Sequence, residues 1–227
     1  MGSKVAGLAI YLDAPLQSWG VLSKFQRRGT ESYPSKSGVL GLVAAAMGID
    51  KRDASEADKL KPLASCKFSA FAVALSDKQQ PVSQLEDYHT VGGGYDKDDP
   101  VQRLRISRKA SGGTSTTVVT RRFYLEQARF IVVLEGDEDL LQKASGSLED
   151  PKWGVWFGRK CCLPSAPLLP TLADTGEKAA SMLLGKLRAS FVGEGRAEED
   201  GDGAWRMPDQ PLSFGSREFA SRPVSRK

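Results

Sequence analysis

The sequence predicts an α+β fold: a ferredoxin-like antiparallel sheet with its helices on one face. The order of β-prone and helical segments is strand, helix, strand, and later again strand and helix, which is typical of this fold. With 227 residues, 40% of them hydrophobic, the chain is long enough to bury a sizeable core. We expect the ferredoxin-like domain to span residues 1–150, with a β-rich C-terminal extension over residues 151–227 packed on it.

The first half of the chain supplies the strand-helix-strand unit. Residues 5–12 alternate small and large apolar side chains and end at an Asp-Ala-Pro turn, which predicts a strand. Apolar residues at helical spacing follow two serines, so a helix is expected to begin near residues 35–37. Residues 55–63 are typical of a charged helix, and the alternation over residues 68–75 predicts a second strand.

A second strand-helix pair follows later in the chain. Residues 129–134 form a strongly β-prone run. Asp137 is expected to begin a helix that Pro151 ends. Its inward apolar residues are Leu140, Leu141, Ala144 and Leu148.

A long glycine-rich segment separates these two units. Residues 91–120 show little apolar periodicity, with glycines at 92–94 and 112–113 and an acidic patch at 96–99. Structureless segments of this length are uncommon inside compact domains and are usually functional or disordered. The segment is therefore expected to be a long mobile excursion.

Positive charge gathers in and after this excursion. Between residues 101 and 134 the only acid is Glu126. The positive residues there are Arg103, Arg105, Arg108, Lys109, Arg121, Arg122 and Arg129. Such a basic face is typical of nucleic-acid contact, although a solvated charged surface gives the same pattern.

Composition excludes several classes of site. His89 is the only histidine, which excludes histidine-rich metal sites and an HNH nuclease centre. The cysteines at 66, 161 and 162 lack zinc-binding spacing and suit reduced thiols. No apolar run of about 18 residues is long enough to cross a bilayer, and the N-terminus lacks a secretory pattern, so we expect a cytoplasmic protein.

The start of the first predicted helix is a candidate anion site. The first amides of a helix are unpaired and its dipole favours an anion there. Ser35 and Ser37 would add hydroxyl donors and Lys36 a point charge. The segment is no Walker loop, because the first glycine is missing, and a plain capped helix gives the same pattern.

Three further motifs carry groups suited to RNA. Tyr88 and His89 offer either acid-base chemistry or base recognition. Arg159 and Lys160 follow three aromatic residues, a mixture found at single-stranded nucleic-acid sites and also in cores. Residues 17–19 (Gln-Ser-Trp) carry donors for RNA oxygens, although the tryptophan alternatively plugs the sheet edge.

Six blocks in one order resemble the CasD subunits of type I-E Cascade, the fifth numbered Cas family. The blocks are residues 15–20 (PLQSWG), 34–42 (PSKSGVLGL), 87–91 (DYHTV), 122–128 (RFYLEQA), 158–162 (GRKCC) and 219–222 (FASR). The resemblance implies a RAMP-type RNA-binding fold akin to the RRM. It also implies a thumb-like β-hairpin at about residues 88–122 that leans over the RNA.

The resemblance implies a non-catalytic subunit of an antiviral ribonucleoprotein complex. It would cap the backbone, hold the 5′ handle of crRNA and touch CasC-type backbone and CasA-type large subunits. Target DNA would be met only through the complex, and no cofactor, metal or membrane is implied. The expected RNA-binding residues are Gln17, Ser18, Trp19, Ser35, Lys36, Ser37, Tyr88, His89, Arg103, Arg105, Arg108, Arg121, Arg159 and Lys160.

Two other functions fit the same residues. The related subunit of subtype I-C is a metal-independent endoribonuclease that uses tyrosine, lysine and histidine, and Tyr88 and His89 keep this reaction open. A generic single-strand binder would instead hold unrelated RNA and DNA as tightly as the handle at matched salt.

Overall fold

A computed structural model describes residues 4–21, 23–24, 26–75, 82–92, 94–96, 98–108, 114–115, 117–199 and 204–227. Lys109 and the glycines at 93, 112 and 113 lie outside the described residues. The helices are α1 (Lys36–Met47), α2 (Glu56–Ala64), η1 (Gln102–Arg105), α3 (Glu138–Glu149) and α4 (Gly176–Leu187). The strands are β1 (Val5–Asp13), β2 (Leu16–Gln17), β3 (Ser23–Lys24), β4 (Arg27–Arg28), β5 (Lys67–Ala74), β6 (Ser83–Gly92), β7 (Ser107–Arg108), β8 (Thr114–Ser115), β9 (Thr117–Glu126), β10 (Arg129–Asp137), β11 (Thr171–Ala173), β12 (Ser190–Phe191), β13 (Arg196–Ala197), β14 (Trp205–Ser213) and β15 (Glu218–Arg226).

The main sheet has the order β11-β1-β10-β5-β13-β15-β14. Strand β1 lies antiparallel between β10 and β11, and β10 is antiparallel to β5 on its other side. Side chains of β1 and β10 are buried on both faces, which explains why their sequences are apolar almost without interruption. The sequence-predicted strands at residues 5–12, 68–75 and 129–134 are confirmed within a residue or two, except that β10 continues to Asp137.

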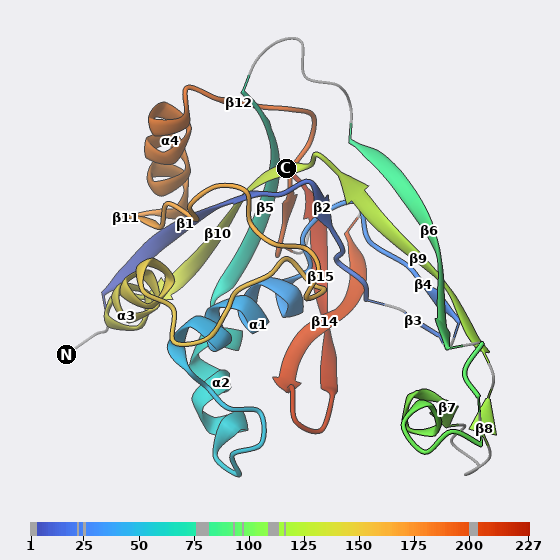
Figure 1. The fold of residues 1–227 in the computed structure, drawn as a ribbon. Coiled ribbons are helices and arrows are strands. Elements are labelled where there is room, and N and C mark those ends of the chain that lie inside the picture. Colours follow the sequence, from blue (N-terminus) through green and yellow to red (C-terminus); the bar gives the residue numbers. More distant parts are fainter. Residues whose placement is uncertain are drawn as a thin grey trace.

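Helices cover both faces of this sheet, which corrects the prediction of helices on one face only. Leu8 and Ile10 of β1 belong to the core cluster that also contains residues of α1 and α3. Ala9 and Tyr11 point to the opposite face, where they cluster with residues of α4. Figure 1 shows α4 on one side of the sheet, with α1 and α3 on the other. Helix α4 was not predicted from the sequence, although Thr175 is a suitable N-cap and its hydroxyl accepts from the Lys178 amide.

Capping side chains set the starts of α1 and α3. The Ser35 hydroxyl accepts from the Gly38 amide, and the Asp137 carboxylate accepts from the Leu140 amide. Both predicted helix starts are therefore confirmed. The residues predicted to face inward from α3 pack as expected, with Leu140 only partly buried.

Strands from the last third of the chain join the same sheet. Strand β11 pairs with β1, and β12 and β13 pair with β5. The predicted domain boundary at residue 150 stays a prediction. Strands from both sides of that boundary are hydrogen-bonded to each other in one sheet.

A long β-hairpin lies where the sequence predicts the excursion. Strands β6 and β9 pair continuously from Ser83 with Glu126 to Gly92 with Thr117. The hairpin therefore begins before the predicted bound at residue 88. Strand β9 also pairs with β2 and β4, which ties the base of the hairpin to the chain after β1. Figure 1 shows the hairpin extending from the side of the main sheet, with η1, β7 and β8 at its far end.

A second hairpin, β14–β15, lies beside the first two helices. Strand β14 contacts both α1 and α2, and the turn after it lies near the end of α1. Phe214 in this turn packs against the main core. Among the described residues, no helix is both long enough and apolar enough to cross a membrane.

We expect the far end of the β6–β9 hairpin to be dispensable for folding. An Asn-Gly turn in place of residues 93–116 would join Gly92 and Thr117, which already pair, and Asn-Gly favours a tight hairpin turn. The thermal midpoint should shift by no more than about 4 °C, because that shift corresponds to about 1 kcal/mol for a chain of this size. Loss of cooperative unfolding in a calorimetric scan would show that this end belongs to the core.

Candidate nucleic-acid interface

Five segments of the chain meet at one groove of about 580 Å³. They are the chain after β2, the end of β4, the start of α1, the loop before Cys161 and the β14–β15 turn. We call this the arginine groove. Its lining residues are Ser18, Trp19, Gly20, Arg28, Gly29, Ser35, Ser37, Gly38, Gly158, Arg159, Phe214, Arg217 and Phe219. Of the residues predicted from the sequence, it therefore brings together Ser18, Trp19, Ser35, Ser37 and Arg159.

The groove is cationic and partly aromatic. Arg28, Arg159 and Arg217 line it, and none of the described lining residues is acidic. Guanidinium groups bind phosphate oxygens through paired donors, so this set suits a polyanion. Phe214 and Phe219 lie edge to face at 6.3 Å and add apolar surface of the kind on which bases stack.

Arg159 is fixed in place by the strands beneath it. Its guanidinium donates to the carbonyls of Phe123 at 3.2 Å and Arg28 at 2.8 Å. The group also lies 4.5 Å from the centre of the Tyr124 ring. Because a guanidinium carries five N–H donors, these contacts position Arg159 and leave donors for a ligand.

A glycine allows this loop to approach the chain after β2. Gly158 has φ +88°, and a Cβ there would lie 1.7 Å from the Ser18 carbonyl oxygen. The Ser18 amide donates to the Phe157 carbonyl at 3.1 Å, and its hydroxyl donates to the Phe123 carbonyl at 3.2 Å. Only glycine has both the conformation and the space for this contact.

Arginines continue from the groove along the base of the β6–β9 hairpin. The parallel pairing of β4 with β9 places Arg27 beside Arg121 and Arg28 beside Arg122. Arg27 lies 4.8 Å from the centre of the Phe123 ring, and Arg121 pairs with exposed Glu86 at 3.3 Å. The sequence patterns did not predict Arg27, Arg28 and Arg217 as site residues. The only local signal was the adjacent pair at 27–28.

Gln17 and Trp19 serve the protein interior, which corrects their assignment as RNA donors. The fully buried Gln17 amide donates to the Ala128 carbonyl at 2.7 Å and accepts from the Trp19 indole at 3.0 Å. The Trp19 ring stacks on Phe157 at 6.0 Å. The polar atoms of both side chains are used in these internal contacts. This agrees with the alternative interpretation in which Trp19 has a structural role.

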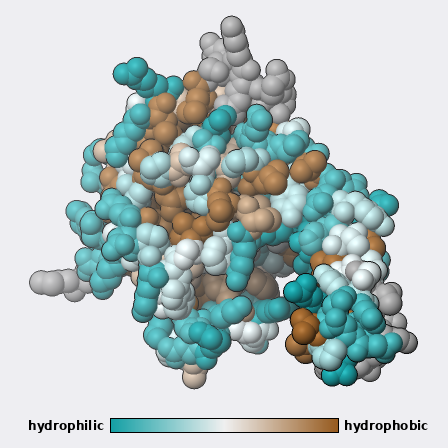
Figure 2. Space-filling model, viewed as in Figure 1, coloured by the Kyte–Doolittle hydropathy of each residue, from teal (hydrophilic) through white to brown (hydrophobic). Residues whose placement is uncertain are grey.

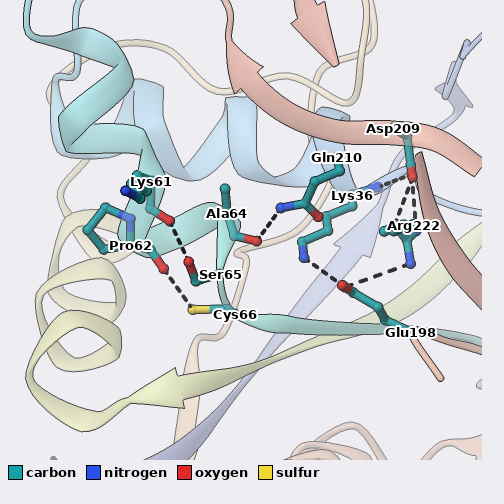
Figure 3. Close-up of polar contacts among 10 residues, drawn as sticks. All are labelled: Lys36, Lys61, Pro62, Ala64, Ser65, Cys66, Glu198, Asp209, Gln210 and Arg222. Atoms are coloured by element: carbon teal, nitrogen blue, oxygen red, sulfur yellow. Dashed lines mark hydrogen bonds and ion pairs between the residues drawn. The ribbon is translucent and has the colours of Figure 1, made fainter. Parts of the chain in front are cut away.

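Lys36 also points inward, which corrects its role as a phosphate contact. Its side chain is 1% exposed, and its ammonium pairs with Glu198 at 2.7 Å. Figure 3 shows this pair among the polar contacts of a buried cluster formed with Asp209 and Arg222. Burial lowers the pKa of Lys36, and the bond to Glu198 opposes that shift.

The first amide of α1 is satisfied by a carboxylate of the protein itself. The Lys36 amide donates to Asp209 at 2.7 Å, and Arg222 donates to both Asp209 oxygens at 2.7 and 3.1 Å. Two cations and two anions thus neutralise one another. We call Lys36, Glu198, Asp209 and Arg222 the ion quartet. It joins α1 to β14 and β15, and therefore positions the turn that brings Phe214 and Arg217 to the groove.

Tyr88 and His89 lie on opposite faces of the β6–β9 hairpin, as neighbours on a strand must. Tyr88 is 65% exposed and lies directly across from Arg121. His89 is half-buried, and its Nδ1 atom is buried without a hydrogen-bond partner. The two side chains therefore do not meet at a common point.

The remaining predicted residues lie outside the arginine groove. Arg103 and Arg105 are exposed on η1, and Arg108 lies in β7 with its side chain outside the described residues. Lys160 is exposed, with its ammonium 5.6 Å from the centre of the Trp156 ring. In the described part of the chain, no cluster of three or more His, Cys, Asp or Glu side chains suits a metal ion.

A mixed α+β fold with a cationic, aromatic groove defines a candidate polyanion-binding protein, and comparisons with known proteins give its family. The family model for CRISPR-associated protein (Cas_Cas5) matches residues 7–225, so the chain belongs to this family. The CRISPR system Cascade subunit CasD of Escherichia coli K12 is 26% identical over 221 residues, covering 95% of this chain and 92% of that protein.

Two solved structures share the fold. A chain of a CRISPR RNA-guided surveillance complex superposes with TM-score 0.72 at 27% identity, covering 97% of this chain and 89% of that one. A crystal structure of a Cas protein gives TM-score 0.61 at 26% identity, covering 97% and 93%. The resemblance to CasD found in the sequence blocks is thereby confirmed.

We predict that the Asp209→Ala substitution strongly destabilises the protein. It would leave Arg222, which is 5% exposed, without its principal partner, and an uncompensated buried charge costs about 3 to 5 kcal/mol. Urea denaturation followed by circular dichroism measures the loss. Glu149→Ala, which removes an exposed carboxylate from the end of α3, should leave the midpoint unchanged. Equal effects of both substitutions would contradict the role of the quartet.

Proposed function

We propose that this chain is the non-catalytic crRNA-binding subunit of a type I-E CRISPR Cascade surveillance complex in the cytoplasm. It would cap the backbone, hold the 5′ handle of the guide RNA, and contact CasC-type and CasA-type subunits. Target DNA would be reached only through the complex. The observation that carries the proposal is the arginine groove, where Arg28, Arg159 and Arg217 converge beside two phenylalanines.

The comparisons support the same assignment. The E. coli relative is a Cascade subunit, and one structural relative belongs to an RNA-guided complex. Both alignments span almost the whole of this chain. A single-stranded guide needs phosphate contacts along its backbone and surfaces for its bases, and the groove offers both.

The proposed RNA surface differs from the one expected from the sequence. Ser37 and Arg159 stay in it, and Arg28 and Arg217 join them. Ser18 and Ser35 also line the groove, but they are buried, and their hydroxyls already bond the Phe123 carbonyl and the Gly38 amide. The β6–β9 hairpin would close over the RNA as a thumb, with Tyr88, His89, Arg103, Arg105, Arg108 and Arg121 along it and Lys160 as a separate anchor. Lys36, Gln17 and Trp19 would support this surface from inside.

The topology suits a ferredoxin-like, RAMP-type interpretation. Strands β11, β1, β10 and β5 are adjacent and antiparallel, with α1 between β1 and β5 in the chain and α3 between β10 and β11. RRM domains bind RNA across the open face of such a sheet. Here α4 covers that face, so we place the RNA at the edge, between the two hairpins.

The geometry of Tyr88 and His89 favours binding over cleavage. A metal-independent ribonuclease needs its acid and base within reach of one phosphate. These side chains project from opposite faces of β6, which separates them.

Arg28→Ala and Arg217→Ala test the groove. Each should weaken binding of a 5′-handle RNA by about 1.5 to 3 kcal/mol, the range for a hydrogen bond to a charged group. The dependence of log K on log salt should become shallower by about 0.7 for each phosphate that the variant no longer neutralises. Titrations of labelled RNA at several NaCl concentrations measure both quantities.

Lys143→Ala is the matched control, because Lys143 is exposed on α3 and is not among the groove residues. Unchanged affinity in both groove variants would reject the groove as the RNA site. Equal affinity of the wild-type protein for unrelated RNA and DNA would favour a generic single-strand binder.

Incubation of the purified chain with repeat RNA in EDTA tests the absence of catalysis. We expect intact RNA, since Tyr88 and His89 do not converge. Gel electrophoresis of the products measures the result. Site-specific cleavage that His89→Ala abolishes would establish the endoribonuclease instead.

A further inference from the structure

A second hollow, of about 430 Å³, lies next to the arginine groove. It is bounded by α1 on one side and by the loop after α3 on the other. We call it the tryptophan hollow. Its lining residues are Gly41, Ala44, Ala45, Ile49, Asp50, Lys51, Arg52, Trp153, Trp156 and Phe214.

The floor and walls of this hollow are apolar. Gly41, Ala44 and Ala45 line it from α1 with no more than a methyl group each, and Trp153 and Trp156 line it from the loop after α3. Trp153 is 38% exposed, and Trp156 is half-buried. Figure 2 shows hydrophobic residues over the middle of one face of the molecule, with hydrophilic residues around them. Exposed tryptophans around an apolar depression are typical of the anchoring pockets of protein interfaces.

The rim of the hollow is positively charged. Lys51 and Arg52 line one side. Lys152 and Lys160 do not line the hollow, but their ammonium groups lie 5.9 Å and 5.6 Å from the centres of the Trp153 and Trp156 rings that do. The only acid lining the hollow among the described residues is Asp50, which pairs with Arg52 at 2.8 Å. An occupant would therefore meet an excess of positive charge.

We propose that the tryptophan hollow is the docking site for a protein segment that presents one large apolar side chain flanked by carboxylates. The apolar side chain would fill the space between α1 and the tryptophans, and the carboxylates would pair with the cationic rim. The identity of the partner, another subunit of the same ribonucleoprotein complex, rests on the proposed function.

The chemistry of the hollow favours a protein segment over a nucleotide. The floor formed by Gly41, Ala44 and Ala45 offers no side-chain donor or acceptor, so a base edge inserted against α1 would find only the indole N–H groups of the tryptophans and the charged rim. Each tryptophan ring also already has a lysine ammonium near it. An aliphatic or aromatic side chain loses no hydrogen bonds on entering such a space.

The position of the hollow couples this partner to the RNA. Phe214 lines both the arginine groove and the tryptophan hollow, so one ring would contact both occupants. The ion quartet holds the hairpin that carries Phe214. A subunit docked in the hollow would therefore pack against Phe214 on the side away from the arginine groove.

Ala45→Glu tests the proposal by placing a carboxylate in the hollow from a half-buried position on α1. The probes are the separately purified CasA-type and CasC-type subunits of the same complex, measured by isothermal titration calorimetry. Ala45→Glu should weaken binding of one of them by about tenfold or more, the loss expected at an interface hot spot. Lys51→Glu should weaken the same interaction, and added NaCl should reduce it in the wild type.

Met182→Glu is the matched control, because Met182 is a 45% exposed apolar residue on α4, away from the hollow. It should bind both subunits as the wild type does. If Ala45→Glu fails to fold, Trp153→Ser removes an exposed wall of the hollow and gives the same readout. Unchanged binding of both subunits by a folded hollow variant, or wild-type binding to neither subunit, would overturn the proposal.

Binding of the 5′-handle RNA by Ala45→Glu separates this proposal from the proposed function. We expect RNA affinity close to that of the wild type. Weakened RNA binding with unchanged subunit binding would make the hollow a nucleotide site and overturn the proposal. Subunit binding that depends on Ala45, in a chain without affinity for the handle, would support the docking site and reject the proposed RNA function.

Discussion

The ion quartet is the interaction on which the rest of the candidate interface depends. Asp209 accepts from the first amide of α1 and from Arg222, while Lys36 reaches Glu198 from the same helix turn. These contacts tie the N-terminal third of the chain to the C-terminal hairpin. In a buried setting such an arrangement tolerates little displacement, because any charge left unpaired is costly. The hairpin turn is therefore held at one position relative to α1.

Because the quartet holds the β14–β15 hairpin against α1, the turn of this hairpin contributes to both the arginine groove and the tryptophan hollow. Phe214 separates the arginine groove from the tryptophan hollow, and Arg217 and Phe219 face the groove from the same turn and strand. The opposite wall of the groove is set by Gly158, whose lack of a side chain lets the loop with Arg159 reach the chain after β2. Both walls are thus held by contacts within the protein itself, and such preorganisation reduces the entropy lost on binding.

The sheet itself is a scaffold and offers no open face. Helices α1 and α3 cover one side and α4 the other, so β1 and β10 can be apolar on both faces. The candidate interface consequently lies beside this sheet, on a second sheet in which β9 pairs with β6 in the hairpin and with β4 in the arginine row.

Features that arise from local interactions can be predicted from the amino-acid sequence. The starts of α1 and α3 follow from capping by Ser35 and Asp137, and the strands follow from apolar patterning over a few residues. The charge asymmetry and the position of the excursion are likewise properties of the chain. The family could be recognised because its sequence blocks keep their order.

Which polar groups face outward depends on contacts that form only in the folded chain. A lysine at a helix start is equally consistent with a phosphate contact and a buried ion pair, and Glu198, 162 residues away, decides for the pair. The role of Gln17 is likewise set by a distant residue, because its amide donates to the Ala128 carbonyl. Arg28 and Arg217 are far apart in the chain and come together only at the groove. Propensity and periodicity act over a few residues, whereas burial depends on contacts between segments that are distant in the chain.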